Sequence, residues 1–215
     1  MPADGTPLAA WLTRLETLSP HEIDLGLERV QAVLGRLTYR RPATVIHVAG
    51  TNGKGSCVEM LGALLAAGGA RIGCYTSPHL RRYTERIRID GREAGDDAIV
   101  AAFERIEAVR DDVPLTYFEY GTLAALLVLS DAGVDAAVLE IGMGGRLDAV
   151  NAIEPDAGLI TNVTLDHCEW LGADVETIAV EKAGIMRRGK PVVFGSKEVP
   201  ATIGREAQRT GAVLL

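Results

Sequence analysis

The stretch Ala49-Gly50-Thr51-Asn52-Gly53-Lys54-Gly55-Ser56 decides the fold class of this chain. An apolar, β-rich run, Thr44–Ala49, leads into it, and a helix-forming run continues from Lys54 to about Ala67. Glycines allow backbone N–H groups to converge on an anion, and a lysine and a helix N-terminus add positive charge. The stretch therefore predicts a phosphate-binding loop between a strand and a helix.

The match to the phosphate-loop pattern G-x-x-x-x-G-K-[ST] is incomplete. Val48 stands at the first glycine position, and Gly55 stands where a serine or threonine should follow the lysine. A glycine-rich turn without a ligand is the simpler alternative. The strand, the glycines, the lysine and the helix together favour phosphate binding, and the missing hydroxyl implies that any metal is held by neighbouring strands.

Composition places the chain among ordinary globular proteins. It has 215 residues, 47% apolar and 24% charged, and its net charge of −7 argues against nonspecific nucleic-acid binding. Cys57, Cys74 and Cys168 show no C-x-x-C spacing, so we expect reduced, non-metal thiols that behave as small buried apolar side chains. No apolar run approaches the ~18 residues of a membrane span, and the N-terminus lacks a signal-peptide pattern, so we expect a cytoplasmic protein without membrane contact.

Short apolar runs alternate with segments of helical periodicity along the chain. The predicted strands are Thr44–Ala49, Arg71–Thr76, Ala136–Ile141, Gly158–Val163 and Pro191–Gly195. The predicted helices are Leu8–Leu18, Leu25–Leu37, Lys54–Ala67, Asp96–Val109, Phe118–Ser130, Asp174–Met186 and Pro200–Gln208. This alternation predicts an α/β fold with a P-loop-type, mostly parallel sheet and helices on both faces.

Polar residues follow several predicted strands, at the edge where open parallel sheets bind ligands. Ser77 precedes a proline after the second strand, Glu140 ends the third, and His167 follows the fourth. Each has a structural alternative, namely a turn serine, a buried ion pair and a structural histidine. Together they form an O/O/N ligand set that suits Mg²⁺.

Four further segments leave alternatives open. The glycine-rich loop 142–148 is either a flexible connector or a backbone that approaches a ligand closely. Thr116–Glu119 fits a capping box, and its aromatic pair could also face a flat ligand. Lys182 lies near the end of a predicted helix, where lysines are usually solvated. The run Arg81–Gly91 predicts a hairpin edge, with contact of one arginine to a phosphate or carboxylate as the alternative.

The motifs, taken in order along the chain, resemble those of a known family. They are Asp24–Val30, the loop Ala49–Ser56, Thr76–Leu80, Thr116–Thr122, Leu139–Asp148 and Leu165–His167. In this order they are similar to the folylpolyglutamate synthase/dihydrofolate synthase family of the Mur ligase superfamily. The resemblance covers the chain from Leu8 onward, and the Thr-Tyr-Phe-Glu form looks like bifunctional bacterial members.

The resemblance implies ATP-dependent amide formation between a pteroate or folate carboxylate and the amino group of L-glutamate, through an acyl phosphate. It also implies roles for particular residues. ATP would be bound by Thr51, Asn52, Gly53, Lys54, Gly55 and Ser56, and Mg²⁺ by Ser77, Glu140 and His167. Lys182 matches a lysine that is carboxylated in the family and helps to organise a second Mg²⁺, so the catalytic set would be Lys54, Lys182 and His167.

The same resemblance implies an acceptor-binding set. The matching residues are Ile23, Asp24, Leu25, Thr116, Tyr117, Phe118, Glu119, Leu147, Asp148 and Ala149. The expected small-molecule partners are dihydropteroate, folates, L-glutamate and ATP, bound by a monomer.

Length is where the chain departs from the family pattern. Family members are about twice as long and carry a Rossmann-like C-terminal domain, so we expect residues 1–215 to be an ATP- and pterin-binding N-terminal domain, truncated at its end. Alone it is expected to have negligible ligase activity and at best weak ATP affinity. The alternatives are a peptidoglycan Mur ligase and a nonenzymatic nucleotide-binding module.

Overall fold

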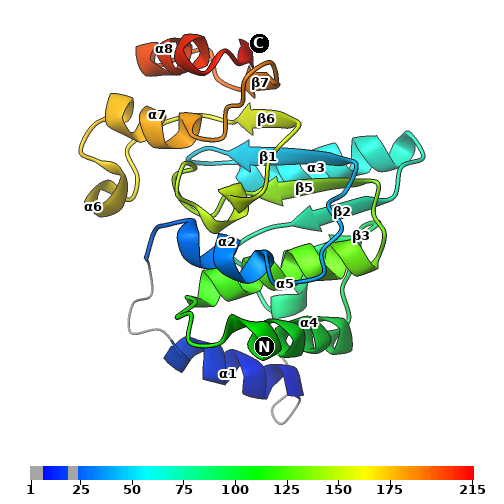
Figure 1. Cartoon of the computed structure of the whole chain (residues 1–215). Coiled ribbons are helices and arrows are strands. Elements are labelled where there is room, and N and C mark those ends of the chain that lie inside the picture. The colour runs from blue at the N-terminus through cyan, green and yellow to red at the C-terminus, as the bar shows by residue number, and fades with distance from the viewer. Residues whose placement is uncertain (1–6, 19–23) are drawn as a thin grey trace.

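A computed structural model describes residues 7–18 and 24–215 of the chain. Its central strand is β1 (Thr44–Ala49), which pairs in parallel with β5 (Ala136–Glu140) on one side and β6 (Ala157–Ile160) on the other. All three strands are rich in Ala, Val, Ile and Leu, as expected for parallel strands covered on both faces. The phosphate loop predicted from the sequence therefore leaves the middle of the sheet (Figure 1).

The eight-stranded sheet has the order β4-β3-β2-β5-β1-β6-β7-β8. The remaining strands are β2 (Ile72–Tyr75), β3 (Ile87–Ile89), β4 (Arg92–Glu93), β7 (Pro191–Phe194) and β8 (Val213–Leu214). The pairs β2–β5, β6–β7 and β7–β8 are parallel, whereas β2–β3 and β3–β4 are antiparallel. The sheet is thus mostly parallel, with an antiparallel edge at β3 and β4.

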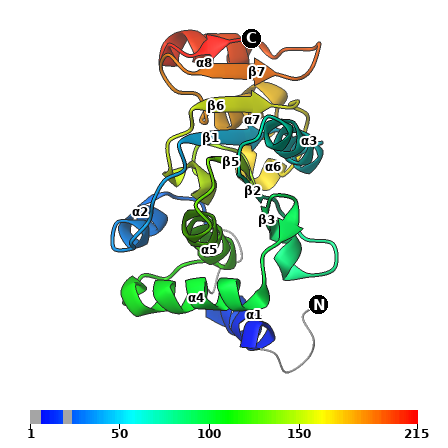
Figure 2. The same ribbon diagram turned by 90° about the vertical axis from the view of Figure 1, so that its right-hand side faces the viewer.

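Helices cover both faces of the sheet, as predicted. Helix α3 (Lys54–Ala67) packs on β1, β2 and β5 from one side, over a small core that includes Val48, Val58 and Val138. The larger core lies on the other side, where α5 is the helix nearest the sheet and α4 and α1 form an outer layer (Figures 1 and 2). The remaining helices are α1 (Pro7–Leu18), α2 (Glu28–Leu34), α4 (Asp96–Arg110), α5 (Tyr117–Asp131), α6 (Cys168–Leu171), α7 (Val175–Ala183) and α8 (Ala201–Thr210), with 3₁₀ turns at Tyr83–Arg86 and Ala149–Ala152.

The predicted α/β fold is confirmed, and the strand and helix around the loop have the predicted bounds. The largest boundary error concerns α2, which spans Glu28–Leu34 and not the predicted Leu25–Leu37. The backbone N–H of Gly26 donates to the Leu147 carbonyl at 3.2 Å, so a contact with a distant loop holds this residue outside the helix. The short helix α6 was not predicted.

Two other expectations were wrong in part. Strands β3 and β4 form the predicted hairpin, but Tyr83–Arg86 is a 3₁₀ turn that buries the Tyr83 and Arg86 side chains, so it is no alternating strand. Of the three cysteines, Cys74 is buried and Cys57 is half-buried, whereas Cys168 is exposed because it begins the short surface helix α6.

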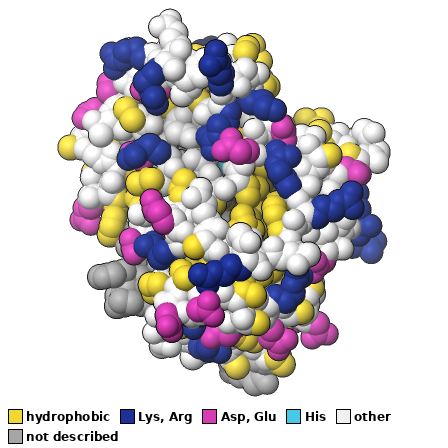
Figure 3. Space-filling model, viewed as in Figure 1, with side chains coloured by type: hydrophobic (Ala, Val, Ile, Leu, Met, Phe, Trp, Pro, Cys, Tyr) yellow, Lys and Arg dark blue, Asp and Glu magenta, His cyan; other side chains and the backbone are white. Residues whose placement is uncertain are grey.

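The surface carries charges of both signs. On the face seen in Figure 3, basic and acidic side chains are interspersed, and apolar side chains are exposed in a hollow near its centre. Within residues 7–18 and 24–215, no helix has the length and apolar character needed to cross a membrane.

Candidate functional site

The carboxyl ends of four neighbouring strands bring the predicted site residues to one edge of the sheet. In the order β2-β5-β1-β6, Ser77 follows β2, Glu140 ends β5, the phosphate loop follows β1, and Thr161 follows β6. Segments up to about 110 residues apart in the sequence therefore line up side by side. This is the edge at which open α/β sheets bind ligands.

The phosphate loop presents unpaired backbone donors. Gly53 takes φ +79° and caps α3, which begins at Lys54. The N–H groups of Gly53, Lys54, Gly55 and Ser56 have no acceptor within the part of the chain that the structure describes. Four donors at a helix N-terminus, where the helix dipole adds positive charge, form a binding site for an anion such as a phosphate.

Residues after β6 hold this loop in place. The Thr51 N–H donates to the Asn162 carbonyl at 3.0 Å, and the Asn52 N–H donates to Asn162 Oδ1 at 3.1 Å. The hydroxyl of Thr161 donates to the Asn52 carbonyl at 2.7 Å, and the Thr164 N–H donates to the Thr51 hydroxyl at 3.0 Å. Thr161, Asn162 and Thr164 were missed as site residues, although their polar run directly after a predicted strand was a usable signal.

Two lysines meet at the carbonyl of Gly50. Nζ of Lys54 lies 3.1 Å from it and Nζ of Lys182 lies 3.0 Å from it. Lys182 is only 3% exposed, so the alternative of a solvated helical lysine is wrong: α7 packs its last turn under the loop instead of facing water. Burial, and then the charge of Lys54, lower the pKa of Lys182 to about 8.

Glu140 fits a metal ligand. Its side chain is 5% exposed and forms no ion pair with any described residue, and burial raises its pKa. The Ser77 backbone N–H donates to Oε2 at 3.1 Å, which brings Ser77, a residue with a hydroxyl, next to this carboxylate. A buried carboxylate beside a hydroxyl is an oxygen donor pair of the kind that Mg²⁺ prefers.

His167, the third predicted ligand, occupies the segment between β6 and α6. It has a left-handed backbone with φ 48°, and its N–H donates to its neighbour Asp166 at 2.9 Å. It lines the same cavity as Ser77. Within the described residues, no three His, Cys, Asp or Glu side chains cluster closely enough to hold a metal, so the predicted set shares one edge without forming a closed cluster of that type.

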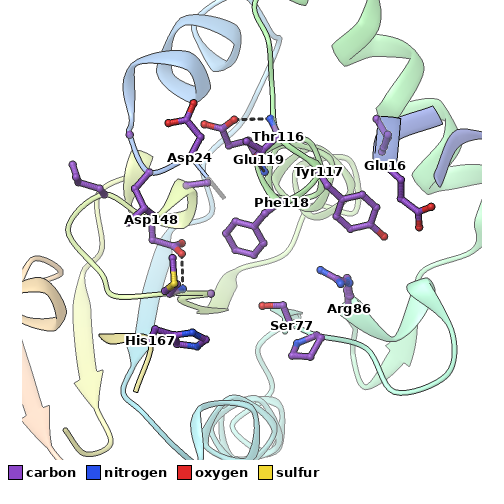
Figure 4. A pocket seen from close by; sticks show the side chains of 18 residues that line it. Glu16, Asp24, Ser77, Arg86, Thr116, Tyr117, Phe118, Glu119, Asp148 and His167 are labelled. Carbon is purple, nitrogen blue, oxygen red and sulfur yellow. Dashed lines mark hydrogen bonds between the residues drawn. The ribbon is translucent and has the colours of Figure 1, made fainter. Parts of the chain in front are cut away.

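A cavity of about 880 Å³ opens beside the phosphate loop. Figure 4 shows Phe118 projecting into it from the start of α5, between Asp148 on one side and Tyr117 and Arg86 on the other. All the predicted acceptor residues that the structure describes line this one cavity: Asp24, Leu25, Thr116, Tyr117, Phe118, Glu119, Leu147, Asp148 and Ala149. Ile23 lies outside the described residues. Leu15, Glu16, Met143 and Arg86 also line the cavity and were not predicted.

Asp148 is a buried carboxylate in the wall of the cavity. Oδ2 accepts from the Met143 N–H at 2.9 Å and Oδ1 from the Val150 N–H at 3.0 Å. Burial outweighs these donors and raises the pKa of Asp148 to about 7. The group can therefore be protonated or ionised near neutral pH, and it offers either a donor or an acceptor to a ligand.

The start of α5 has the predicted capping box. The Glu119 N–H donates to the Thr116 hydroxyl at 3.2 Å, and the Thr116 N–H donates to Glu119 Oε2 at 2.7 Å. Arg29 adds a donor to Glu119 Oε1 at 3.0 Å and pairs with Asp24 at 2.7 Å, so the polar atoms of this corner are largely used within the protein. The aromatic rings of Tyr117 and Phe118 remain available to a flat ligand.

The glycines of loop 142–148 approach protein atoms. A Cβ on Gly142 would lie 2.5 Å from the Phe118 ring, and a Cβ on Gly145 would lie 2.6 Å from the Glu181 carbonyl oxygen. At those two positions the loop is therefore neither a flexible connector nor a backbone exposed to a ligand, because protein atoms occupy the space. It is packed tightly between α5 and α7, and this packing sets the position of Asp148.

Comparison with known proteins agrees with this geometry. Residues 48–209 match the model of the Mur ligase middle domain. The chain is 50% identical over 214 residues to the dihydrofolate synthase/folylpolyglutamate synthase of Escherichia coli (99% of this chain, 51% of that protein). It is 44% identical over 205 residues to the protein of the same name from Haemophilus influenzae (95% and 47%).

Solved structures give the same result. The E. coli protein FolC in complex with DHPP and ADP superposes with a TM-score of 0.95 at 49% identity, over 100% of this chain and 52% of that one. A bifunctional folylpolyglutamate synthase/dihydrofolate synthase with Mn, AMPPNP and L-glutamate bound gives 0.91 at 49% identity, over 98% and 52%. The relatives are thus nucleotide- and metal-binding ligases of folate metabolism.

The chain spans about half the length of the curated relatives that it matches. The match to the middle-domain model covers most of the chain and includes the phosphate loop, Ser77, Glu140 and His167. The chain therefore belongs to the Mur ligase family.

Proposed function

We propose that this chain is the nucleotide- and acceptor-binding half of an ATP- and Mg²⁺-dependent ligase. The reaction joins L-glutamate to dihydropteroate, and to tetrahydrofolate for polyglutamylation, through an acyl phosphate. One observation carries the proposal: the unpaired N–H groups of the phosphate loop and the acceptor cavity open on the same edge of the sheet. A phosphoryl donor and a carboxylate acceptor could therefore meet there.

The loop would hold the nucleotide. Backbone N–H groups from Gly53 to Ser56 face a phosphate without competing acceptors, and Lys54 supplies a positive charge once its Nζ leaves the Gly50 carbonyl. Phosphoryl transfer depends mostly on positioning and charge neutralisation, and these donors provide both. Thr51 and Asn52 hold the loop in shape through their bonds to the residues after β6.

The cavity would hold the acceptor. Phe118 and Tyr117 offer faces for a flat ring system, and Asp148 can exchange hydrogen bonds with a heterocycle that carries both donors and acceptors, such as a pterin. Leu147, Ala149 and Leu25 add apolar wall to the same space. These features favour a pteroate or folate over the nucleotide-sugar peptides of peptidoglycan ligases.

Glu140, Ser77 and His167 would hold the divalent cation. The buried, unpaired carboxylate of Glu140 is the feature of this chain that supports the assignment. When bound, Mg²⁺ would neutralise charge that develops on the transferred phosphoryl group. A glycine at position 55, where a hydroxyl residue is usual, would then not impair metal binding, because Ser77 on the neighbouring segment would supply the hydroxyl.

Lys182 is proposed to carry a carboxyl group. A carbamate forms by attack of the neutral amine on CO₂, and the lowered pKa of Lys182, about 8, makes the neutral amine accessible near physiological pH. Carboxylation would also turn a buried cation beside Lys54 into an anion that Lys54 and a metal can neutralise. ¹³C NMR of the chain in ¹³C-bicarbonate should show a carbamate signal that Lys182→Arg lacks.

The reaction places separate demands on the cleft. The acceptor carboxylate must attack the terminal phosphate, and the amine of glutamate must then attack the acyl phosphate while water is excluded. This chain supplies the phosphate loop and the acceptor wall. We expect it to be a cytoplasmic monomer whose ligase activity alone is negligible, because relatives of twice its length carry further structure.

Isothermal titration calorimetry tests the proposal. With ADP and Mg²⁺ present, dihydropteroate should bind this chain, and Phe118→Ala should weaken the binding by about tenfold through loss of ring contact. Leu80→Ala, a substitution at an exposed residue outside the cavity, is the matched control and should bind as the parent chain does. Binding of a UDP-muramyl peptide in place of dihydropteroate would contradict the proposal.

Turnover needs a separate assay. The chain alone should release no ADP in response to glutamate, whereas a fusion of this chain to the second half of the E. coli relative should form dihydrofolate. A Glu140→Ala version of the fusion should lose that activity. Glutamate-dependent ADP release by residues 1–215 alone would refute the expected inactivity of the isolated chain.

A further inference from the structure

Arg86 is a buried cation without an anion. It is 8% exposed, and no Asp or Glu of the described residues forms an ion pair with it. The other described arginines either pair with carboxylates, as Arg29 and Arg146 do, or lie at the surface. A buried guanidinium without a direct ion pair is costly, and Glu140 attracts Arg86 only from beyond ion-pair distance, so the retention of Arg86 needs an explanation.

Neighbouring side chains orient the Arg86 guanidinium. Nε donates to Nδ1 of His79 at 2.9 Å, and the guanidinium carbon lies 5.3 Å from the Tyr83 ring centre and 5.6 Å from that of Tyr117. The rings favour a cation near them and limit its rotation. Nε is used by His79, and the Tyr75 hydroxyl also interacts with the guanidinium, so the remaining Nη hydrogens form the fork that suits a carboxylate or phosphate.

This fork faces the acceptor cavity. Arg86 lines the cavity together with Ser77 and Tyr117, and Figure 4 shows the three side by side, across the cavity from Asp148. Asp148 and Asp24 therefore lie across the cavity from Arg86, whereas Glu16 lies on the side of Tyr117 and Arg86. Glu16 also lines it but does not come within ion-pair distance of Arg86.

We propose that Arg86 binds the carboxylate of the acceptor substrate and so selects acceptors that carry a carboxylate. This inference rests on the proposed function and adds the residue that recognises the reacting group. Its position next to Ser77, at the edge that also carries Glu140 and the phosphate loop, would hold the carboxylate where a phosphoryl group can reach it. His79, Tyr83 and Tyr117 would be positioning residues for Arg86.

The test is a cycle of two ligands and two proteins, measured by calorimetry with ADP and Mg²⁺ present. Pteroate carries the carboxylate, and pteroate amide has the same shape without the charge. The unaltered chain should bind pteroate about 10- to 100-fold more tightly than the amide, as expected for a charge-assisted, forked contact. Arg86→Met should remove that preference and bind the amide as well as the unaltered chain does.

The outcomes are distinguishable. If neither ligand binds the unaltered chain, the proposed function fails and the inference fails with it. If Arg86→Met keeps the preference for pteroate, Arg86 does not bind the carboxylate although the function stands. If Arg86→Met instead weakens AMPPNP binding and keeps the preference, the fork binds the nucleotide phosphate, which also overturns the inference.

A second variant covers the case in which Arg86→Met does not fold. Arg86→Lys retains a cation but loses the fork, so it should keep part of the preference and bind the amide normally. Arg88→Met is the control: Arg88 lies on β3, pairs with Glu59 of α3 and is not among the cavity residues, so its loss should change neither affinity. Full pteroate preference in Arg86→Lys would contradict the role of the fork, and loss of preference in Arg88→Met would contradict the assignment to Arg86.

Discussion

The phosphate loop and the acceptor cavity lie beside each other but are built in different ways. The loop is one continuous segment, Ala49–Ser56, and its binding groups are backbone N–H donors. The cavity takes its wall from segments spread between Leu15 and His167, and its binding groups are side chains. Binding by the loop depends on its local backbone conformation and tolerates few backbone changes. Binding by the cavity depends on long-range packing and on the charge states of buried side chains.

The largest effect is expected from a backbone change in the loop. A Cβ on Gly50, whose φ is +146°, would lie 1.8 Å from the Thr161 hydroxyl, so Gly50→Ala should lower the free energy of unfolding by about 3 kcal/mol or prevent folding. Gly53 also has positive φ, +79°, but a Cβ there meets no atom within 4 Å. Gly53→Ala should cost about 1 kcal/mol. Urea denaturation of both variants checks this, and equal losses would contradict the role given to Thr161.

In the cavity, the corresponding effect on stability comes from the ionisation of Asp148. Folding raises the pKa of Asp148 from 3.8 to about 7, so between these values the folded state holds a proton that the unfolded chain has lost. Stability is therefore lost as pH rises through this window. Relative to Asp148→Asn, the unaltered chain should lose about 3 kcal/mol of unfolding free energy from pH 5 to pH 8.

Asp156 provides the matched control for this pH dependence. Its hydrogen bonds with Arg41 and Lys190 overcome its desolvation and lower its pKa to about 2, so it stays ionised throughout the range. Asp156→Asn should shift stability by a constant amount between pH 5 and pH 8. A difference between Asp148→Asn and the unaltered chain that is equally flat would show that Asp148 is ionised in the folded protein.

The capping box at the cavity should have an intermediate effect. Thr116→Val removes the hydroxyl that accepts from the Glu119 N–H and should cost about 1 kcal/mol of unfolding free energy. Because Thr116 also lines the cavity, pteroate binding should weaken along with stability. Asp174→Ala, which removes the cap of α7 away from the cavity, should cost a similar amount of stability without changing pteroate binding.

The smallest stability change is expected at Glu140, where function and stability oppose each other. Glu140→Gln removes a buried charge but keeps an acceptor for the Ser77 N–H, so unfolding free energy should stay constant or rise by up to about 1 kcal/mol. Mn²⁺ binding in the presence of AMPPNP, followed by electron paramagnetic resonance, should weaken about tenfold or more. Glu59→Gln, at an exposed ion pair on α3, should leave Mn²⁺ binding unchanged.

The contrast between loop and cavity also explains how much the sequence could predict. The bounds of β1 and α3 followed from a local pattern, and so did the capping box at Thr116. Ser77, Glu140 and His167 were placed at one edge because parallel strands carry their ends there. These inferences needed only neighbouring residues and a topology rule.

The errors arise where distant contacts decide the structure. The helix pattern alone favoured a solvated Lys182, and only the family resemblance gave it a role, because nothing local shows that α7 packs under Gly50. The late start of α2 depends on a hydrogen bond from Gly26 to Leu147. The glycines of loop 142–148 are needed because Phe118 and Glu181 pack closely against them. Several arginines occur in the run Arg81–Gly91, and only the burial of Arg86 in the structure distinguishes it from the others.

The central claim is that two adjacent regions bind two different ligands, and an NMR titration tests it most directly. In ¹H–¹⁵N spectra of the chain, AMPPNP with Mg²⁺ should shift the amides of Gly53, Lys54, Gly55 and Ser56 most. Pteroate should shift those of residues 24–26, 116–119 and 147–149 most, with small changes in the loop. If both ligands shift the same set of amides, or if pteroate shifts none, the division into a phosphate loop and an acceptor cavity is wrong.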